Sequence, residues 1–370
     1  MTADRMSGAA SIERLEVSVY KVPTDYPESD GTAEWDATTV VLVRAHGAGR
    51  TGLGWTYGDM ASATVVHSTL AGVVAGRDAL RVSAAWEAMI AACRNLGRPG
   101  VASMAIAAVD TALWDLKARI LELPLATLLD AAHDAVPVYG SGGFTSYPNE
   151  RLAEQLGGWA AQGIARVKMK VGRDPERDLE RVRVAREAIG PDTELYVDAN
   201  GALSRMQALG FARRYADDFD VRWFEEPVSS DDLEGLRFLR DRAPGGMDIA
   251  AGEYGYKLDY FEQMLAAGAV TCLQADVTRC EGITGFLRVA ALCQARSLEL
   301  SAHCGPSIHV HPCCAVIPFR HLEYFHDHVR LEQILFDGVL EPENGALHPD
   351  LTRPGNGLEL KRADADRYAI

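Results

Sequence analysis

Single polar residues recur at a near-constant spacing through the middle and later parts of the chain. Each ends or closely follows a short apolar run, the runs are roughly 20 to 28 residues apart, and a segment with helical spacing follows most of them. A strand–helix unit of a (β/α) barrel takes roughly 25–30 residues, and such barrels carry functional side chains at the C-terminal ends of their strands. The residues in these positions are Lys168, Lys170, Asp198, Glu225, Glu253, Asp276, His303 and Glu323. The spacing therefore predicts that two lysines, five carboxylates and one histidine face a single cavity.

The first third of the chain has a different order, with strands followed by helices. Residues 11–22 alternate between apolar and polar side chains and predict a strand, while residues 38–44 and 52–55 flank a glycine-rich turn and predict a hairpin. Residues 23–36 have no periodicity and are expected to form a polar loop. Alanine-rich helical segments follow at residues 60–75, 79–94 and 102–122. This order is typical of an α+β domain.

From residue 136 onward, short apolar strands alternate with helices. Strands are predicted at residues 136–141, 166–171, 194–199, 221–226, 247–252, 271–276, 297–302 and 320–324. Helices are predicted at residues 149–163, 175–189, 204–216, 231–242, 257–267, 282–296 and 309–317. This alternation favours a closed barrel over an open sheet. After Phe325, prolines and glycines predict irregular structure that returns toward the first domain.

These patterns give an expected division of the chain. We expect a flexible tail at residues 1–10, an α+β domain over residues 11–130 with a contribution from residues 345–370, and a barrel domain over residues 131–344. A length of 370 residues suits a barrel with one further domain.

Composition narrows the possible partners and the compartment. The net charge of −15 argues against nucleic acid and anionic membranes as partners. The sequence contains no apolar run long enough to span a membrane and no secretory signal, so a cytoplasmic protein is expected. The seven cysteines form no CxxC motif and most are expected to be buried small apolar residues in a reducing compartment. We expect a homo-oligomer, between a dimer and an octamer.

Three of the strand-end carboxylates predict a metal site. Asp198, Glu225 and Glu253 follow successive strands, and three carboxylates in close proximity repel one another unless a cation balances their charge. Ligation by oxygen atoms alone suits Mg²⁺. The alternative, three unrelated solvated acids, does not explain their regular spacing.

The remaining strand-end residues suggest proton transfer. Lys168 and Lys170 point to the same side of one strand, and their mutual repulsion near Mg²⁺ is expected to lower the pKa of Lys170 to about 7–8, the range of a general base. Asp276 is expected to orient His303 by a hydrogen bond. Glu323, buried among other acids, is expected to have a raised pKa and to be protonated. The alternative for the lysine pair is an exposed strand edge, which the apolar neighbours Val167 and Met169 disfavour.

A further group of histidines does not fit a metal site. These residues are dense near the C-terminus, but their spacing matches no closed tetrahedral pattern, so structural or loop roles are expected. They are His309, His311, His321, His326 and His328.

Several motifs resemble those of a known family. They are Lys-Met-Lys at residues 168–170, Asp-Ala-Asn at 198–200, Trp-Phe-Glu-Glu-Pro at 223–227, Ala-Gly-Glu at 251–253, Gly-Ile-Thr-Gly at 282–285, Ser-Ala-His at 301–303 and His-Leu-Glu at 321–323. With them the chain resembles the enolase superfamily and, within it, the mandelate racemase subgroup, which includes mandelate racemase, muconate lactonizing enzyme and acid-sugar dehydratases. The resemblance extends over about residues 11–360.

The resemblance implies a fold, a cofactor and roles for the site residues. The implied fold is α/β, a (β/α)₇β modified TIM barrel with an N-terminal α+β capping domain. Mg²⁺ is implied to bind Asp198, Glu225 and Glu253 together with a substrate carboxylate. Lys170 is the implied base on one face of the substrate, and His303, supported by Asp276, acts on the other. Lys168 is implied to neutralise a carboxylate oxygen and Glu323 to donate a hydrogen bond to the enediolate.

The same resemblance implies where specificity arises. Two loops of the capping domain, here residues 23–36 and 52–60, are implied to contact the substrate, the second through Trp55 and Tyr57. Asn200 and Glu226 are expected beside the metal ligands. Neither loop has a long apolar patch, and the polar side chains of the first loop favour a hydroxylated substrate, such as a sugar acid.

The expected activity is that of a lyase acting on a small-molecule carboxylate. Removal of the proton α to the carboxylate would be followed by loss of the β-hydroxyl, so that an aldonic or aldaric acid gives a 2-keto-3-deoxy acid. The alternative is a racemase or epimerase that returns the proton to the opposite face of a 2-hydroxy acid or amino-acid derivative. A Schiff-base aldolase using Lys170 is a weaker alternative, because such an enzyme does not need three carboxylates beside its lysine. A non-catalytic binding protein is also weaker, because it does not need the complete set of strand-end residues.

Overall fold

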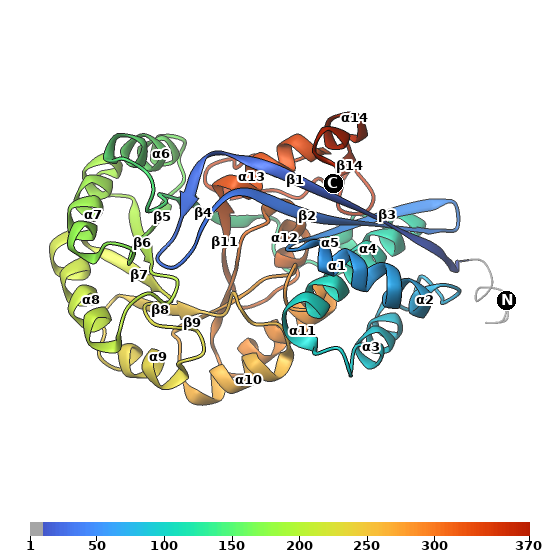
Figure 1. Cartoon of the computed structure of the whole chain (residues 1–370), viewed down its shortest axis with the longest axis horizontal. Coiled ribbons are helices and arrows are strands. Elements are labelled where there is room, and N and C mark those ends of the chain that lie inside the picture. The colour runs from blue at the N-terminus through green and yellow to red at the C-terminus, as the bar shows by residue number, and fades with distance from the viewer. Residues whose placement is uncertain (1–9) are drawn as a thin grey trace.

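A computed structural model describes residues 10–370, which form a closed barrel and an N-terminal sheet-and-helix domain packed against it (Figure 1). Of the expected tail at residues 1–10, only Ala10 lies among the described residues. Its carbonyl accepts a hydrogen bond from the Ala79 amide at 2.8 Å, and its side chain is buried. Within residues 10–370, no helix is both long enough and apolar enough to cross a membrane.

The N-terminal domain contains an antiparallel sheet in the order β1 (Ile12–Ser29), β2 (Glu34–Gly47) and β3 (Arg50–Tyr57). Ala48 and Gly49 connect β2 to β3 with φ values of 50° and 70°. A two-residue turn with both φ values positive matches the twist of the flanking strands. The predicted hairpin is therefore confirmed, with longer strands than the pattern indicated.

The polar loop predicted at residues 23–36 is wrong. Strand β1 continues through Pro23 to Ser29 and β2 begins at Glu34, so that only residues 30–33 form the turn. The pairing shifts register between Pro23 and Glu28. Such an irregularity interrupts the alternation of inward and outward side chains, which explains why these residues have no strand periodicity.

Helices cover one face of this sheet. Their bounds are Met60–Val65 (α1), Val66–Leu70 (η2), Ala71–Val74 (α2), Val82–Ala92 (α3), Arg98–Ala102 (η3), Ser103–Ile120 (α4) and Leu125–Leu128 (α5). Helix α4 lies directly on β3. A Cβ atom at Gly54 would lie 2.4 Å from the Ala108 carbonyl oxygen, so the contact depends on a glycine at that position.

Eight parallel strands close the barrel. They are Val136–Gly142 (β4), Arg166–Lys170 (β5), Glu194–Asp198 (β6), Val221–Glu225 (β7), Asp248–Ala251 (β8), Cys272–Ala275 (β9), Glu299–Ala302 (β10) and Phe319–Phe325 (β11). Each strand pairs with the next, and β11 pairs with β4 through partners such as Leu322 and Val138. All eight predicted strands are confirmed, with ends that differ by at most two residues.

Helices connect these strands and form the outer ring (Figure 1). They are Asn149–Ala161 (α6), Pro175–Ile189 (α7), Arg205–Phe219 (α8), Leu233–Arg240 (α9), Leu258–Ala267 (α10), Gly282–Ala295 (α11) and Pro306–Cys314 (α12). A further helix, His326–Leu335 (α13), follows β11 directly. The irregular structure predicted after Phe325 therefore begins only after this helix.

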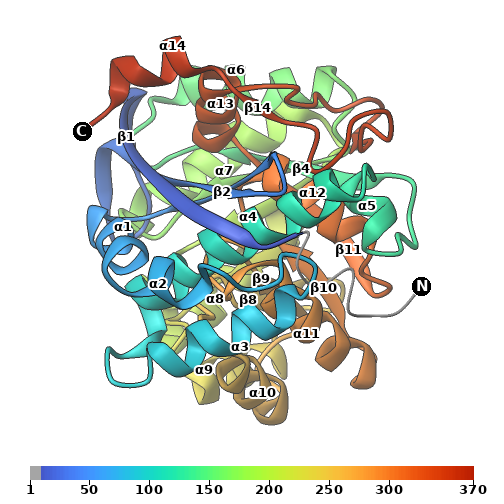
Figure 2. The same ribbon diagram turned by 90° about the vertical axis from the view of Figure 1, so that its right-hand side faces the viewer.

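The C-terminal residues return to the N-terminal sheet. Short strands Phe336–Asp337 (β12) and Glu359–Leu360 (β14) pair with each other, and Ala346–Leu347 (β13) pairs antiparallel to β4. Helix α14 (Arg362–Ala365) and the turn η4 (Asp366–Tyr368) follow. The Ile370 amide donates to the Val19 carbonyl at 3.1 Å, and Figure 2 shows α14 close to β1.

Candidate active site

The strand-end residues predicted from the spacing all meet at one end of the barrel. Lys168 and Lys170 come from β5, Asp198 ends β6, Glu225 ends β7, and Glu323 lies in β11. The other three lie one or two residues beyond strands β8, β9 and β10; they are Glu253, Asp276 and His303. All eight side chains are buried. The barrel registration predicted from the sequence therefore brings them into a single site.

The backbone is strained just after three of these strand ends. Asn200, Glu226 and Cys304 have φ values of 44°, 37° and 51°, in the left-handed region that non-glycine residues rarely adopt. Such positions cost roughly 1–3 kcal/mol each and persist where the surrounding structure enforces them, often at functional sites. At Glu226 the enforcing bonds are from its amide to the Ala250 carbonyl (2.9 Å) and from the Gly201 amide to its carbonyl (2.8 Å).

The three predicted metal ligands form one cluster. Asp198, Glu225 and Glu253 each present an oxygen atom, and these atoms all lie within 4.8 Å of one another. The Asn200 amide donates to Asp198 Oδ1 at 2.8 Å, and the indole of Trp223 donates to Glu225 Oε2 at 2.8 Å. These bonds fix the orientation of the carboxylates. Three buried carboxylates with convergent oxygen atoms fit Mg²⁺, which prefers oxygen ligands.

Both lysines form ion pairs with this cluster. Lys168 Nζ contacts Glu225 and lies 2.8 Å from Glu323 Oε1, and Lys170 Nζ lies 2.5 Å from Asp198 Oδ2. Burial lowers the pKa of Lys170, but the charges of Asp198, Glu253 and Glu323 together outweigh it and the net pKa is raised. The predicted fall in the Lys170 pKa is therefore wrong for the protein chain alone, because the negative charge of Asp198 affects this pKa more than the positive charge of Lys168 does.

Glu323 differs from its prediction in the same way. Its oxygen atoms accept hydrogen bonds from Ser141 Oγ (2.6 Å) and the Cys304 amide (3.1 Å), and Lys168 adds an ion pair. Burial raises the pKa of Glu323, but the positive charges of Lys168, His303 and Lys170 together lower it by more, so the net pKa lies below its usual range. The prediction of a protonated Glu323 is therefore wrong in this charge environment.

Asp276 and His303 form the predicted pair. His303 Nδ1 lies 2.8 Å from Asp276 Oδ2, while Asp276 Oδ1 accepts bonds of 2.7 Å from both the amide and the hydroxyl of Thr278. The other ring nitrogen, Nε2, lies 3.0 Å from Glu253 Oε2. Burial lowers the pKa of His303, but Cys304, Glu253, Glu323 and Asp276 together raise it well above its usual value. His303 is thus oriented with Nε2 toward the carboxylate cluster.

Several residues in the site were not predicted from the sequence. Ser141 is the next-to-last residue of β4 and would have been found by the same strand-end rule. Arg279 lies three residues after Asp276, with Nη1 3.2 Å from the Glu253 carbonyl and Nε 3.8 Å from Asp276 Oδ2. Cys304 was grouped with the structural cysteines, but its Sγ lies 3.1 Å from His303 Nε2. All seven cysteines are buried and free, as predicted, and no sequence pattern separates Cys304 from the others except its place after His303.

The second capping-domain loop is not where the sequence predicted it. Residues 50–57 belong to β3, and Trp55 is fully buried with its ring centroid 4.6 Å from that of Phe336. Trp55 is therefore a core residue and does not face a substrate. Tyr57 stacks on His328 with a centroid distance of 3.5 Å and donates a hydrogen bond to Glu332 at 3.0 Å. These contacts place Tyr57 at the interface between the two domains.

The dense C-terminal histidines have structural partners. Their ring nitrogens contact backbone groups or side chains: His309 with the Val277 amide (2.8 Å), His311 with the Ala126 amide (3.1 Å), His321 with Ser301 Oγ (2.9 Å), His326 with Asp25 (3.1 Å) and His328 with the Gly305 amide (3.2 Å). The His326–Asp25 pair ties the β1–β2 segment to the barrel. The structural interpretation of these histidines is therefore confirmed.

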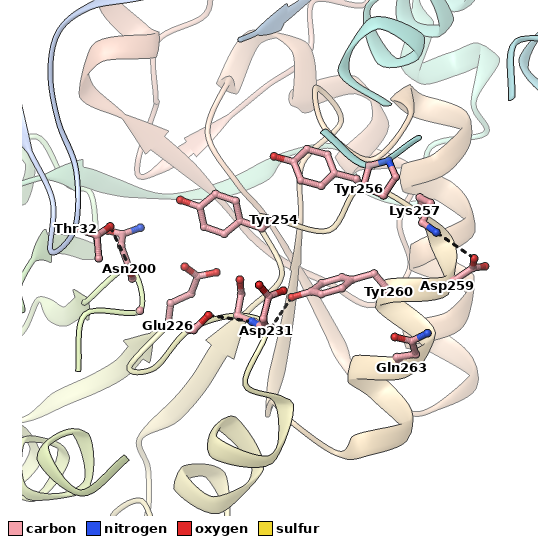
Figure 3. Close-up of a pocket in the computed structure, with 14 residues that line it drawn as sticks. Thr32, Asn200, Glu226, Asp231, Tyr254, Tyr256, Lys257, Asp259, Tyr260 and Gln263 are labelled. Carbon is pink, nitrogen blue, oxygen red and sulfur yellow. Dashed lines mark hydrogen bonds and ion pairs between the residues drawn. The ribbon is translucent and has the colours of Figure 1, made fainter. Parts of the chain in front are cut away.

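A cavity of about 730 Å³ opens beside the carboxylate cluster (Figure 3). Thr32 from the β1–β2 turn and Pro99 from η3 contribute its capping-domain side. Asn200, Glu226 and Tyr254, each one or two residues beyond a predicted metal ligand, line its barrel side. The turn at residues 30–33 is in close contact with the barrel, because a Cβ atom at Gly31 would lie 2.3 Å from the Ala199 carbonyl oxygen. The capping domain therefore closes over the site.

The fold and site define an enzyme class in which a capping domain covers a barrel that carries three buried, convergent carboxylates. Residues 14–130 match the model of the mandelate racemase / muconate lactonizing enzyme N-terminal domain, and residues 151–365 match the model of the enolase C-terminal domain-like family. The chain belongs to the mandelate racemase / muconate lactonizing enzyme family of the enolase superfamily.

Individual relatives cover nearly the whole chain. The 3,6-anhydro-alpha-L-galactonate cycloisomerase of Streptomyces coelicolor is 35% identical over 97% of this chain and 99% of its own. A mandelate racemase/muconate lactonizing enzyme-like protein from Rubrobacter xylanophilus is 62% identical, with a TM-score of 0.96 over 97% of this chain and 100% of its own. L-talarate/galactarate dehydratase from Salmonella typhimurium LT2, solved with Mg and L-lyxarohydroxamate, is 27% identical, with a TM-score of 0.89 over 100% of this chain and 95% of its own.

Proposed function

We propose that the protein is a Mg²⁺-dependent lyase that removes the proton α to the carboxylate of a sugar acid and then eliminates the β-oxygen. The observation that carries this proposal is the arrangement of two candidate bases around one carboxylate cluster. Lys170 contacts the Asp198 end of the cluster, and His303 contacts the Glu253 end. The relation to a cycloisomerase and a dehydratase of sugar acids supports the same choice of substrate.

Asp198, Glu225 and Glu253 would hold the Mg²⁺, which when bound supplies positive charge to a substrate carboxylate and stabilises the enediolate. Lys168 adds a second positive charge beside that carboxylate. Lys170 Nζ acts in its neutral amine form, which Mg²⁺ on Asp198 would favour by cancelling the charge that raises the Lys170 pKa. It takes the α-proton, which breaks the Cα–H bond. Those electrons first spread onto the carboxylate, and in a second step they form the Cα–Cβ double bond as the β-carbon–oxygen bond breaks and His303 Nε2 gives its proton to the leaving oxygen. Tautomerisation then yields the 2-keto-3-deoxy acid.

The leaving oxygen distinguishes two versions of this lyase. In a dehydratase it is a hydroxyl, which leaves as water. In an anhydro-sugar acid, the class of substrate given in the name of the 3,6-anhydro-alpha-L-galactonate cycloisomerase, the leaving oxygen belongs to a ring ether. This oxygen stays in the product as a new hydroxyl. The same two proton-transfer residues serve both versions, so the distinction depends on the substrate that the cavity accepts.

A racemase or epimerase is the second candidate function. The specific observation that favours it is that Lys170 and His303 approach from strands β5 and β10, which are separated in the barrel by β4 and β11. Two proton-transfer groups on different sides of one carbon permit removal from one face and return to the other. The two functions share the first step and differ in whether a carbon–oxygen bond breaks.

A screen of acid sugars tests the proposal. The purified protein with Mg²⁺ is expected to form a 2-keto acid from at least one aldonic, aldaric or anhydro-sugar acid, detected with a carbonyl reagent. The same incubations in D₂O, followed by NMR, detect racemisation or epimerisation as deuterium at Cα without a 2-keto product. Absence of both signals across the library contradicts the proposal.

Metal removal tests the cofactor. Activity found in the screen is expected to disappear after treatment with EDTA and to return on addition of Mg²⁺, because Asp198, Glu225 and Glu253 require a cation to bring a substrate carboxylate near them. Full activity in a sample verified as metal-free by elemental analysis would contradict the role assigned to the cluster.

A further inference from the structure

We propose that the cavity beside the carboxylate cluster selects aldonic acids, which have one carboxylate, over aldaric acids, which have a second carboxylate at the far end. The inference rests on the proposed function, because it assumes that the reacting carboxylate lies at Asp198, Glu225 and Glu253. It identifies Glu226, Asn200 and Tyr254 as the residues that recognise the substrate's hydroxyls, and Asp231 and Asp259 as the groups that reject a second carboxylate.

Two buried oxygen atoms at the cavity wall lack hydrogen-bond partners. They are Asn200 Oδ1 and Glu226 Oε1, in residues that are 9% and 1% exposed. Both residues line the cavity, and Figure 3 shows the Glu226 carboxylate and the Tyr254 hydroxyl directed toward the space next to Asn200. Buried polar atoms normally have partners, and each exception in a native protein calls for an explanation. A ligand in this cavity supplies the missing partners.

The chemistry of these atoms favours a hydroxyl as that partner. A hydroxyl both donates and accepts hydrogen bonds, whereas an ionised carboxylate only accepts. A substrate carboxylate next to Asn200 Oδ1 would bring an acceptor against an acceptor. Hydroxyls along a sugar chain satisfy both oxygen atoms, and the Tyr254 hydroxyl adds a group that donates or accepts.

The charges around the rest of the cavity disfavour a second carboxylate. Among the described residues that line it, Lys257 is the one lysine or arginine, whereas Asp231 and Asp259 contribute negative charge. Lys257 Nζ lies 3.6 Å from Asp259 Oδ2, and Figure 3 shows the two side chains directed toward each other. The single cation is therefore balanced within the protein. A distal carboxylate would meet more negative than positive charge.

A further cation beside the cavity residue Tyr254 is also paired with acids. The guanidinium of Arg279 lies over the Tyr254 ring, 5.1 Å from its centroid, and its Nη1 contacts the backbone and side-chain oxygens of Glu253 at 3.2 and 3.4 Å. Arginine recognises a carboxylate best through two parallel hydrogen bonds. Nη1 of Arg279 is paired with Glu253 and Nε lies 3.8 Å from Asp276 Oδ2, and Tyr254, but not Arg279, lines the cavity. The cavity, at about 730 Å³, has ample room for a sugar acid of about six carbons.

Matched acid pairs test the preference in turnover and in binding. D-gluconate with D-glucarate, and D-galactonate with galactarate, are compared by kcat/KM for the 2-keto product and by calorimetric Kd with the Mg²⁺-loaded protein. At least one aldonate is expected to exceed its aldarate partner tenfold in both measurements. Equal or tighter binding of the aldarates, or no binding of any of the four acids, overturns the inference. The absence of product with a retained binding preference contradicts the proposed function alone.

Variants separate the two parts of the inference. Glu226→Met, which removes both oxygens, is expected to weaken aldonate binding at least tenfold, whereas Glu226→Gln, which keeps hydrogen-bonding capacity, is expected to retain most of it. The Mg²⁺ affinity of each variant, measured separately, must remain close to wild type for this comparison. Unchanged aldonate binding by Glu226→Met overturns the role of Glu226.

Charge removal tests the role of Asp231 and Asp259. The double variant Asp231→Asn with Asp259→Asn is expected to raise the ratio of the aldarate value to the aldonate value, in kcat/KM or affinity, about fivefold or more. Asp192→Asn, an exposed change of the same kind outside the cavity, is the matched control and is expected to leave this ratio unaltered. A ratio that stays unchanged in the double variant overturns the electrostatic part.

Discussion

Individual side chains in the site are held by hydrogen bonds from neighbouring residues. Thr278 fixes one oxygen of Asp276, Trp223 fixes one oxygen of Glu225, and Ser141 fixes one oxygen of Glu323. Such bonds reduce the reorganisation that charged groups undergo when a substrate binds or reacts. The site therefore depends on residues that carry no charge and that a search for ionisable groups would overlook.

Substitution of the two proposed proton-transfer residues is expected to separate the steps of the reaction. In Lys170→Ala, both exchange of the substrate α-proton with D₂O and product formation should fall by at least a thousandfold. In His303→Asn, exchange should persist while product formation is lost, because Nε2 would no longer protonate the leaving oxygen. NMR of the substrate during turnover measures both quantities. Wild-type turnover by both single variants would contradict the site.

Replacement of one proposed metal ligand is expected to weaken Mg²⁺ binding. Glu253→Gln removes one of three negative charges from the cluster, and the expected loss of affinity is at least tenfold. Titration calorimetry with Mg²⁺ measures the change. Glu234→Gln is the matched control, because the Glu234 side chain is 90% exposed. An unchanged Kd for Glu253→Gln would exclude Glu253 as a ligand.

At the scale of elements, the contact between β3 and α4 determines how the capping domain is assembled. Gly52 and Gly54 allow the helix backbone to approach the strand, because Cβ atoms there would lie 2.2 Å and 2.4 Å from helix carbonyl oxygens. Asp115 in α4 accepts a hydrogen bond from the Leu53 amide at 2.7 Å. The two elements thus form one unit with little space between them.

An alanine at the contact is expected to separate these elements. Gly54→Ala introduces a methyl group against helix backbone, which cannot rotate away, so a loss of about 3 kcal/mol or more in the free energy of unfolding is expected. Urea denaturation followed by circular dichroism measures it. Gly72→Ala, where an added Cβ has no atom within 4 Å, is the control and should be neutral or slightly stabilising. A similar stability for both variants would show that the close approach is not required.

Elements with a regular pattern could be predicted from the sequence, whereas those with an irregular one could not. The barrel strands have apolar runs that end in a charged residue, such as the run before Asp198, and this signal was sufficient to predict their order and the convergence of the site. The shift of register near Pro23 removed the alternation that identifies a strand. Trp55 was predicted to face the substrate because the sequence does not indicate which face of β3 contacts the core.

Charge states in the site could not be predicted from the sequence either. The pKa values of Lys170 and Glu323 shift in the opposite directions to those predicted, because each residue lies against an opposite charge rather than a like one. Strand-end positions predict which residues meet. They do not predict which pairs within the group lie closest, and distances of a few ångströms decide the sign of a pKa shift.

At the scale of the whole molecule, buried acids join the capping domain to the barrel. Asp110 in α4 accepts hydrogen bonds from the Thr284 amide and hydroxyl in α11, at 2.9 and 2.7 Å. Glu332 in α13 accepts from the Tyr57 hydroxyl and the Ser307 amide, both at 3.0 Å. Burial raises the pKa of each carboxyl to about 7. The attachment of the two domains is therefore expected to respond to pH near neutrality.

The stability of the protein is expected to depend on pH through Glu332. The folded pKa of Glu332 is about 7 and the ordinary value is 4.5, so between these values the folded protein keeps a proton that the unfolded chain releases. The proton on Glu332 therefore contributes less to the free energy of unfolding of the wild type as pH rises from 4.5 to 7, by about 3 kcal/mol in total, at about 1.4 kcal/mol for each pKa unit.

The Glu332→Gln variant tests this dependence, because its amide side chain cannot titrate. Relative to wild type, the unfolding free energy of this variant should rise by about that amount between pH 5 and pH 8, measured by urea denaturation in EDTA. Glu234→Gln, the exposed control, should show a pH-independent difference. The same flat difference for Glu332→Gln would mean that Glu332 is ionised throughout the range and that its burial has no effect on the pH dependence of stability.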